Sequence, residues 1–340
     1  MKKNISYIVA SLLLSGLVAS CAKPAQKTNA PQVIASFWRK VTPADSLMEG
    51  FRVIEAEGQT RYIVPITEWT ASPEVDTYHQ LHHHGVALES DLMAYRIYFD
   101  RKQTIDVYAK KTPRLELPTS YWYPNDEQLA DHYGDDILRV SGTIGVGSVK
   151  PWRDGKMRHV EPVESRTQRI VYQTNDSAAM EVSVKGWQTE GKTVDMTVRY
   201  TLLAHHRDMR CEVFLSEPLD SLCTGVQQVP FKNPDKSPDS FIFADASYNN
   251  KGTVLGSWGT DWPVNDTVKY AKETVGLGVF IPKEYATESA LVQTPNLVCL
   301  FRPATYLCFY LTCVALKEDN PPARNAEEFR DILYHWANGL

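Results

Sequence analysis

The sequence predicts a mainly β protein, built as a large antiparallel two-sheet β-sandwich with a short C-terminal helix. Three observations lead to this prediction. Apolar and polar residues alternate over many short segments, which is typical of strands with one buried face. Clusters of turn-forming residues separate these segments at intervals that suit antiparallel meanders better than crossover helices. A strong helical repeat occurs in one place, close to the C-terminus.

The predicted strands are rich in β-branched and aromatic residues. The clearest of them cover residues 95–99, 104–108, 168–172, 180–185 and 194–200. The clusters Glu-Gly-Lys at 190–192 and Asn-Asn-Lys-Gly at 249–252 predict turns between strands. Because each half-buried strand has one apolar face, two sheets packed against each other are the expected arrangement.

The C-terminal helix is predicted from its cap and its apolar stripe. Asn325 can cap the first turn, and Glu328 lies three residues later, as in a capping box. The residues that then repeat at helical spacing are Phe329, Ile332, Leu333 and Trp336. We expect this stripe to pack on the sandwich, so that the C-terminus is ordered. A weaker helical pattern covers residues 126–132.

The N-terminus has the layout of a lipoprotein signal peptide over residues 1–20. Lys2 and Lys3 precede an apolar run that is too short for a permanent membrane-spanning helix. Cys21 follows small residues and would carry the lipid anchor of an exported protein. A secretory signal with an incidental cysteine is the alternative. Residues 21–35 are polar and predict a lipidated tether, and residues 36–340 are expected to form a single β-sandwich domain.

Composition argues against a nucleic-acid partner. Of 36 basic side chains, 34 remain without Lys2 and Lys3, against 41 acidic ones, and they form no basic run. Five cysteines follow Cys21, which leaves at least one free thiol, and none has the C-x-x-C spacing of a zinc or redox centre. We expect them to be small buried apolar residues. They are Cys211, Cys223, Cys299, Cys308 and Cys313.

Residues 78–92 carry the densest set of chemically active side chains, with four histidines and two carboxylates. In an extended chain His82 and His84 share one face, and with Glu89 they outline a metal site on a β-scaffold. The pattern is similar to the cupin signature, although the glycines of that signature are missing. We therefore expect no cofactor, with a metal held by these three residues as the alternative.

Proton transfer by the same segment is the competing interpretation. A histidine titrates near neutral pH, and Tyr95 or Arg96 would join it, depending on which of them faces a cleft. Hydrogen bonding within a rim loop or strand is the alternative for any one of these histidines. The crowding of polar groups beside Gly85 favours a functional role for the segment as a whole, because such groups are costly to bury without a use.

Two further groups stand out. Asp135 and Asp136 form either a turn, which we favour, or a pair of acids, and glycines follow them at 142, 145 and 147. These glycines lack the order and the helix of a dinucleotide loop, and favour a bulge or a close backbone approach in a strand.

The second of these groups contains two tryptophans. Trp258 and Trp262 flank Asp261 on a predicted Gly-rich loop, a combination typical of sugar subsites because flat aromatic faces stack on sugar rings. Core burial is the alternative for each tryptophan singly. The sequence contains no Gly-x-Ser-x-Gly, P-loop or His-Glu-x-x-His motif.

The stretch 84–108 and the later Gly-Asp-Asp-Ile-Leu-Arg-Val at 134–140 resemble the domain-of-unknown-function family 4861, found largely in lipoproteins of Bacteroidetes. The likeness covers most of the mature chain and is strongest over residues 79–149. The chain departs from the family pattern at Tyr133, where the family usually has a tryptophan, and near Leu88, where the family usually has a bulky aromatic residue. No catalytic residue is transferred from the family.

The resemblance implies an architecture like the galactose-mutarotase and polysaccharide-lyase sandwiches. It also implies a setting of polysaccharide utilisation, often of pectin and other uronate-containing glycans. Cys21 is followed by no acidic cluster, which by resemblance to Bacteroidetes export signals favours an outer-membrane anchor facing the periplasm. The expected partners are a carbohydrate ligand and, through the lipid anchor alone, the membrane.

The leading hypothesis is a carbohydrate-active enzyme that cleaves uronate-containing oligosaccharides by β-elimination or by hydrolysis. Elimination would use Arg96 to neutralise the sugar carboxylate, His84 as the base and Tyr133 as the acid. Hydrolysis would use a pair of carboxyl groups, Glu89 and Asp135. The predicted substrate-binding residues are His82, Trp258, Asp261 and Trp262.

Two alternatives come from other classes of protein. One is a non-catalytic glycan-binding lipoprotein that uses Trp258 and Trp262. The other is a metal-dependent, cupin-like sugar isomerase or oxygenase. The sugar hypotheses require the histidine-rich segment and the tryptophan loop to meet in one groove that solvent can reach.

Overall fold

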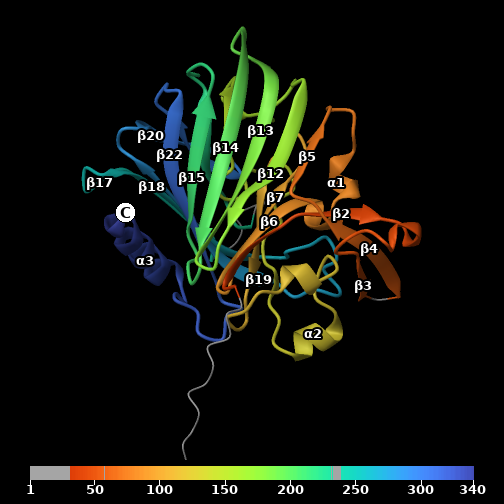
Figure 1. Ribbon diagram of the computed structural model, residues 1–340. Helices are drawn as coiled ribbons and strands as arrows, with labels where there is room; N and C mark the ends of the chain where they lie inside the picture. Colours follow the sequence, from red (N-terminus) through yellow and green to blue (C-terminus); the bar gives the residue numbers. More distant parts are fainter. Residues whose placement is uncertain (1–30, 57, 231, 233–238) are drawn as a thin grey trace, which may run out of the picture. The chain divides into compact units, whose positions relative to one another are not determined.

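Antiparallel sheets make up most of the structure, a computed structural model that describes residues 31–340 except 57, 231 and 233–238 (Figure 1). The predicted mainly β class and the short C-terminal helix are confirmed. The predicted signal peptide, Cys21 and residues 22–30 of the tether lie outside the described residues. Within the described ranges, no helix has the length and apolar character needed to cross a membrane.

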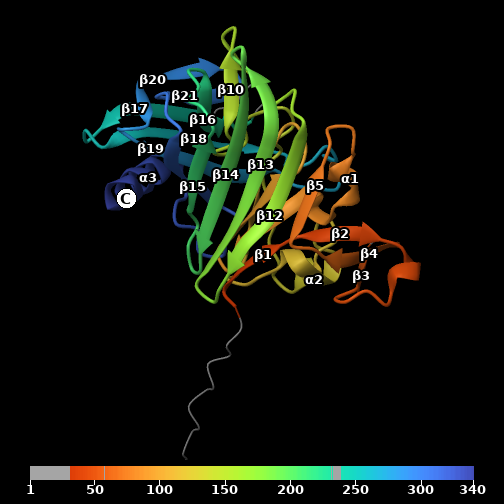
Figure 2. The same cartoon turned by 45° about the horizontal axis from the view of Figure 1, so that its top comes forward.

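A nine-stranded sheet forms the first layer of the sandwich, in the order β17-β18-β19-β22-β15-β14-β13-β12-β5. The long strands β12 to β15 lie side by side in Figures 1 and 2. They include the strands predicted at 168–172, 180–185 and 194–200. The nine strands are β5 (Glu68–Ala71), β12 (Ser165–Gln173), β13 (Ser177–Thr189), β14 (Lys192–Leu203), β15 (Met209–Leu215), β17 (Phe241–Tyr248), β18 (Gly252–Asp261), β19 (Glu273–Pro282) and β22 (Tyr306–Ala315).

Two five-stranded sheets form the second layer, because β1 and β6 contact β12 and β13, and β16 contacts β18 and β19. The first, in the order β1-β6-β7-β8-β9, comprises β1 (Val33–Ser36), β6 (Gly85–Ser90), β7 (Met93–Tyr98), β8 (Ile105–Ala109) and β9 (Asp135–Asp136). The second, in the order β11-β10-β16-β21-β20, comprises β10 (Lys150–Arg153), β11 (Lys156–Met157), β16 (Leu222–Gln227), β20 (Ala286–Gln293) and β21 (Asn296–Phe301).

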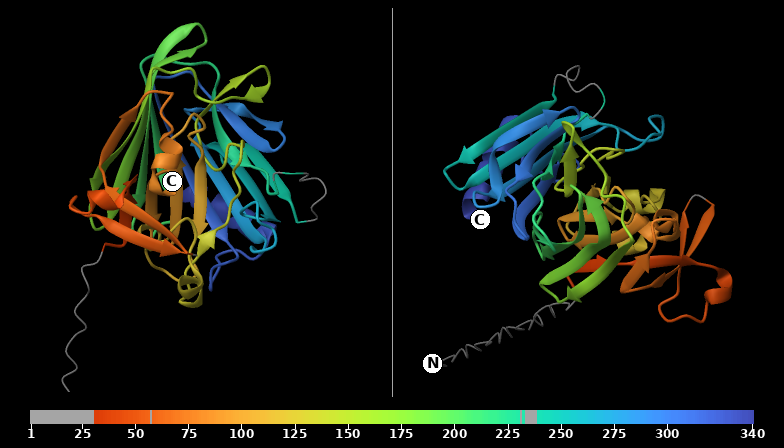
Figure 3. Two further views of the ribbon diagram at one scale, coloured as in Figure 1. Left: turned by 90° about the vertical axis from the view of Figure 1, so that its right-hand side faces the viewer. Right: turned by 90° about the horizontal axis from the view of Figure 1, so that it is seen from above.

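A small sheet, β2-β4-β3, lies on the side of the sandwich away from β17 and β20 (Figure 3). Its strands are β2 (Trp38–Val41), β3 (Arg52–Ala56) and β4 (Gln59–Pro65). Short helical elements accompany it: the 3-10 turns η1 (Pro43–Asp45), η2 (His82–His84) and η3 (Leu117–Thr119), and the helices α1 (Thr77–Gln80) and α2 (Asp126–Ala130). Helix α2 confirms the weaker helix prediction at 126–132.

Strands β7 and β8 are buried on both faces, and not on one face as the alternation predicted, and the neighbouring β6 is buried in the same way. Tyr95 belongs to the main core against the nine-stranded sheet. On the opposite face, Ala94 and Tyr108 pack against Leu117 and Tyr123. The segment 117–123 therefore covers the outer face of this sheet, and the polar residues of that face are enclosed beneath it.

Two features differ from the sequence prediction: where the folded part begins, and where three glycines lie. The folded part begins within the stretch predicted as tether, because Val33 is fully buried and pairs with Ser90 across β1 and β6. The glycines at 142, 145 and 147 lie outside the named strands. The predicted close approach is nevertheless present, since a Cβ on Gly145 would lie 2.3 Å from the carbonyl oxygen of Ile105.

Helix α3 (Ala326–Gly339) confirms the predicted C-terminal helix and its cap. The Asn325 side chain accepts a hydrogen bond from the backbone N–H of Glu328 at 2.9 Å. Phe329 and Leu333 are fully buried, and a Cβ on Gly276 of β19 would lie 2.7 Å from the Phe329 ring. The five cysteines of the described chain are also buried and free, as expected.

We expect Phe329→Ala to lower the free energy of unfolding by about 3–5 kcal/mol, because it removes a fully buried ring and leaves a cavity under α3. Urea denaturation followed by circular dichroism measures the change. The neighbouring Arg330→Ala is the matched control, since this side chain lies at the surface and should change stability by less than about 1 kcal/mol. Equal effects of the two substitutions would contradict the proposed packing of α3.

Candidate active site

A polar cavity of about 420 Å³ lies at the outer face of the sheet β1-β6-β7-β8-β9. Its floor consists of Arg96 from β7, Asp106 from β8 and Asp136 from β9. Residues 138–141 and 263–265 line its rim. Aromatic side chains from α1, η2 and the covering segment line its wall, namely Tyr78, His84 and Trp122.

Strand register brings the three charged side chains of the floor together. Arg96 pairs with Asp106 across β7 and β8, and Tyr108 pairs with Asp136 across β8 and β9, so these side chains leave the sheet on one face. Nη2 of Arg96 donates to Oδ2 of Asp106 and, at 3.1 Å, to Oδ2 of Asp136. The three residues are only 3%, 1% and 4% exposed, so each charge depends on the others for compensation.

The two carboxyl groups on this one guanidinium are not equivalent. The Asp106 carboxylate accepts from the Tyr98 hydroxyl at 2.6 Å and from the backbone N–H of Val107 at 2.9 Å. Burial raises the pKa of Asp136 well above its usual value, and the neighbouring Asp106 raises it further, against the opposing effect of Arg96. Asp136 is therefore a carboxyl group that retains its proton to a higher pH than an ordinary aspartate.

The wall of the cavity is a stack of three rings with His84 in the middle. The imidazole lies 3.6 Å from the Tyr78 ring and 4.2 Å from the Trp122 ring, measured between centroids, with interplanar angles of 7° and 17°. Cations lie over the two outer rings: Lys102 is 5.5 Å from the Tyr78 centroid, and Arg61 is 3.7 Å from that of Trp122. This packing fixes the orientation of the imidazole.

Hydrogen bonding assigns the His84 tautomer. Its Nδ1 lies 2.9 Å from the carbonyl oxygen of Tyr78, which can only accept, so Nδ1 carries the proton and Nε2 has a lone pair. Burial, and then the charge of Arg96, lower the pKa of His84 to about 2. The imidazole is thus neutral at any physiological pH. It can accept a hydrogen bond from a ligand hydroxyl, but it is a weak base, which is unfavourable for its predicted role in elimination.

His82, predicted to bind substrate, is enclosed. The three histidines form the helical turn η2, with φ of 55° at His83 and 62° at His84, so the extended face that His82 and His84 would share does not exist. His82 is 1% exposed, and its Nδ1 accepts from Arg61 at 2.9 Å. His83 Nε2 donates to the Leu117 carbonyl oxygen at 2.9 Å. Both histidines therefore hold the covering segment in place.

Glu89 has a structural environment outside this cavity. Its fully buried carboxylate accepts from Lys110 Nζ and from the backbone N–H groups of Glu116 and Leu117. It therefore fixes the start of the covering segment. The three ligands of the predicted metal alternative do not converge, and no group of three histidine, cysteine or acidic residues in the described chain is placed to hold a metal ion.

Tyr133 and Asp135 also lie outside the residues that line the cavity. The Tyr133 hydroxyl is 3.2 Å from Thr119 Oγ1, and the guanidinium of Arg114 is 4.2 Å from its ring centroid. Asp135 and Asp136 form strand β9, and not the favoured turn, so their side chains alternate. Asp136 is the residue that enters the cavity.

The tryptophan segment meets the cavity through residues other than the tryptophans. Trp258 lies on strand β18, and not on a loop, and is 4% exposed with its ring 5.7 Å from Phe329, so it belongs to the packing under α3. Trp262 is partly buried, with Lys272 Nζ 4.4 Å from its ring centroid. Asp261 Oδ1 accepts from the Trp262 N–H at 2.8 Å. The next residues, 263–265, line the same cavity as His84.

Sequence reasoning thus found His84 and Arg96 and missed most of their neighbours. Asp106 is the polar residue between the apolar Ile105 and Val107 of a predicted strand, which was a usable signal. Trp122 lies in the run Tyr-Trp-Tyr at 121–123, an aromatic cluster in a segment without strand periodicity. Neither signal specifies which strands are adjacent, and this adjacency creates the site.

Asp135 gives a prediction about pH. Burial raises its pKa to about 6, so the folded chain holds this proton more tightly than the unfolded chain. Its stabilising contribution is complete below about pH 4 and is lost as the pH rises through about 6, on the order of 2–3 kcal/mol in all. In Asp135→Asn the fall in unfolding free energy between about pH 4 and 7 should be smaller by this amount. Urea titrations at each pH measure it, with exposed Asp331→Asn as the control, and an unchanged pH slope in Asp135→Asn would contradict it.

Comparison with known proteins gives weak structural matches. No curated protein matches the sequence. A provisionally assigned kojibiose phosphorylase from the human microbiome superposes with a TM-score of 0.36 at 11% identity, over 80% of this chain and 35% of that chain. A 4-alpha-glucanotransferase from Thermococcus litoralis superposes with a TM-score of 0.30 at 12% identity, over 73% of this chain and 40% of that chain. The chain thus spans well under half the length of either protein.

The comparison with protein families has a clear result, and it confirms the resemblance seen in the sequence. The family model described as "Domain of unknown function (DUF4861)" matches residues 19–340, which is nearly the whole chain. The chain therefore belongs to the DUF4861 family.

Proposed function

We propose that this protein is a carbohydrate-active enzyme that hydrolyses glycosidic bonds in the cavity above Arg96. The observation that carries the proposal is the pair of buried carboxyl groups, Asp106 and Asp136, held on one guanidinium beside an aromatic wall. Glycoside hydrolysis needs one carboxyl group that donates a proton and a second that is negatively charged. Asp136, whose pKa is raised by its surroundings, suits the first role, and Asp106, which accepts from Arg96, suits the second.

In this proposal Asp136 is the general acid. Its raised pKa keeps a proton available, and this proton moves to the glycosidic oxygen as the bond to the anomeric carbon breaks. Arg96 then stabilises the carboxylate that Asp136 becomes. Asp106 attacks the anomeric carbon as the bond to the leaving oxygen breaks, and forms a glycosyl ester. Water then attacks that carbon, its proton passes to the Asp136 carboxylate, and the Asp106 carboxylate is released.

The spacing of the two acids favours a retaining reaction. Both Oδ2 atoms contact the same Nη2 of Arg96, so they lie within about 6 Å of each other. Retaining enzymes hold their carboxyl groups roughly 5–5.5 Å apart, whereas inverting enzymes need roughly 6.5–9.5 Å to admit a water molecule.

Sugar binding is assigned to the wall and the rim. Tyr123 lines the cavity and offers aromatic surface to the apolar face of a sugar ring, and Trp122, whose ring is packed against His84 and Arg61, adds its edge. Nε2 of His84 is an acceptor for a hydroxyl. Lys102 and Arg139 also line the cavity, and they are the cations that the carboxylate of a uronate would meet. The preference for uronate-containing, pectin-like oligosaccharides remains a prediction from the family resemblance, as does the lipid anchor at Cys21.

Hydrolysis is favoured over β-elimination by two properties of the same residues. Elimination needs a cation free to neutralise the substrate carboxylate, but Arg96 is already paired with Asp106 and Asp136. It also needs a base, and a histidine whose pKa is about 2 removes protons poorly. A non-catalytic glycan-binding role would use the same aromatic wall, and it is the second candidate.

A substrate panel tests the proposal. The purified protein is incubated with oligogalacturonides and with xylo-, malto- and galacto-oligosaccharides, and reducing ends and unsaturated-uronate absorbance are read in parallel. We expect new reducing ends without the absorbance of an unsaturated product, because hydrolysis adds water and elimination does not. Absorbance rising together with reducing ends would establish elimination, and binding without any product would establish the glycan-binding role.

Asp136→Asn tests the acid directly, with Asp135→Asn as a control at the adjacent position of the same strand. Loss of a general acid typically costs about 10²–10⁴-fold in turnover, so Asp136→Asn should lose at least about 100-fold while Asp135→Asn stays within a few-fold of wild type. Wild-type kcat/KM should fall as the pH rises through the raised pKa of Asp136, because the proton is then lost before the reaction. A larger loss in Asp135→Asn than in Asp136→Asn would reverse the assignment.

A further inference from the structure

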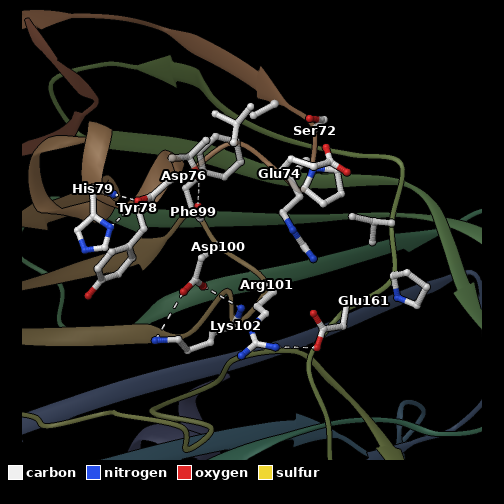
Figure 4. Close-up of a pocket in the computed structure, with 17 residues that line it drawn as sticks. Ser72, Glu74, Asp76, Tyr78, His79, Phe99, Asp100, Arg101, Lys102 and Glu161 are labelled. Carbon is white, nitrogen blue, oxygen red and sulfur yellow. Dashed lines mark hydrogen bonds and ion pairs between the residues drawn. The ribbon is translucent and has the colours of Figure 1, made fainter.

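A second cavity, of about 810 Å³, lies beside the proposed active site and takes no part in the chemistry described above (Figure 4). Three segments line it: residues 71–79 between β5 and α1, the turn 99–102 between β7 and β8, and residues 161–166. We propose that this cavity is a subsite for neutral sugar units of an oligosaccharide whose scissile bond lies in the active-site cavity. The inference rests on the proposed function and adds to it the substrate class, a chain longer than a disaccharide.

The two cavities adjoin because two residues belong to both. Tyr78 and Lys102 line the active-site cavity and the second cavity alike. The two cavities are therefore direct neighbours, with these two side chains at their common border. Subsites that follow one another in this way suit a linear chain and not two separate small ligands.

The shared wall is held in place by hydrogen bonds. Thr77 at the start of α1 donates to the carbonyl oxygen of Phe99. Lys40 Nζ donates to the carbonyl oxygen of His79 at 2.6 Å, and His84 Nδ1 donates to that of Tyr78 at 2.9 Å. Helix α1 is thereby tied to the turn 99–102, to β2 and to η2, which fixes the border between the two cavities, as successive sugar units require.

The chemistry of the lining suits hydroxyl groups. Figure 4 shows Asp76 facing His79, and Arg101 facing Glu161. The Asp76–His79 pair is joined at 2.7 Å and the Arg101–Glu161 pair at 3.2 Å, and all four side chains are well exposed. Acceptors and donors thus alternate along the cavity, and a sugar hydroxyl, which both donates and accepts, matches such pairs.

Charge balance separates neutral sugars from acidic ones. The lining carries four carboxylates and three cationic side chains: Glu74, Asp76, Asp100 and Glu161 against Arg101, Lys102 and Arg166. The formal balance of these seven side chains is −1. A second carboxylate or a sulfate would therefore meet net repulsion here, whereas a neutral pyranose would not.

Arg166 adds an independent observation at the inner side of this cavity. It is 7% exposed, and its Nη2 donates to the carbonyl oxygen of Val160. Its Nη1 is buried and has no acceptor among the described residues. A donor left in this state is a position at which a ligand hydroxyl or an ordered water completes the hydrogen bonding.

Chain-length dependence of binding tests the inference. Isothermal titration of the Asp136→Asn protein, which should bind without turnover, uses xylo-, malto- and β-1,4-galacto-oligosaccharides of two to six units, and oligogalacturonides of the same lengths. For one neutral series we expect the dissociation constant to fall at least ten-fold between two and four units. The added substitutions Glu74→Ala and Arg101→Ala should abolish this gain, because they remove an acceptor and a donor from the second cavity. Glu127→Ala with Arg330→Ala, on α2 and α3, is the matched control and should leave the gain intact.

The outcomes separate this inference from the proposed function. Equal affinity for two and four units, or a gain that survives Glu74→Ala with Arg101→Ala, would overturn the second subsite alone. A gain confined to oligogalacturonides would overturn its neutral character. Absence of binding by every oligosaccharide to both the wild-type and the Asp136→Asn protein would overturn the subsite and the proposed function together.

Discussion

The ion pairs of Arg96 with Asp106 and Asp136 are the interaction on which the rest of the site depends. Arg96 and its two carboxyl partners come from three adjacent strands and are enclosed together, and removing Arg96 or Asp106 would leave the other charge uncompensated in a medium that solvates it poorly. Their enclosure requires the covering segment 117–123, which Glu89 and the buried histidines hold against the sheet. Glu89, which the sequence predicted to be catalytic, thus helps to hold the covering segment over Arg96, Asp106 and Asp136.

Much of the fold could be predicted from the sequence because its determinants are local. Alternation within 168–172 and 194–200 marks a strand whatever it pairs with, and the Asn325 cap with its apolar stripe marks α3. Burial was harder to predict. Strands β7 and β8 alternate like half-exposed strands, but their polar side chains hydrogen-bond to one another under the covering segment, which comes from elsewhere in the chain.

The candidate site could be predicted in part, and its gaps have physical causes. His84 and Arg96 were found because they lie in a conspicuous segment. Asp136 was passed over for Asp135, a difference of one residue, because the face on which a side chain lies depends on strand register that no local pattern gives. Trp258 was assigned to a loop because glycines surround it, although those glycines make room for the ring of Phe243 and for the backbone at Val229.

The position of Tyr78 has a consequence for how this protein can diverge. The Tyr78 ring stacks on the His84 imidazole of the active-site cavity and also lines the second cavity. Helix α1, which carries Tyr78, is tied by hydrogen bonds to three other segments. If the proposed function and the proposed subsite hold, changes at this position would alter reactivity and the recognition of chain length together. Exposed residues 72–76, by contrast, line only the second cavity. In the proposed function, substitutions there would change the preferred length of the ligand without changing the reaction.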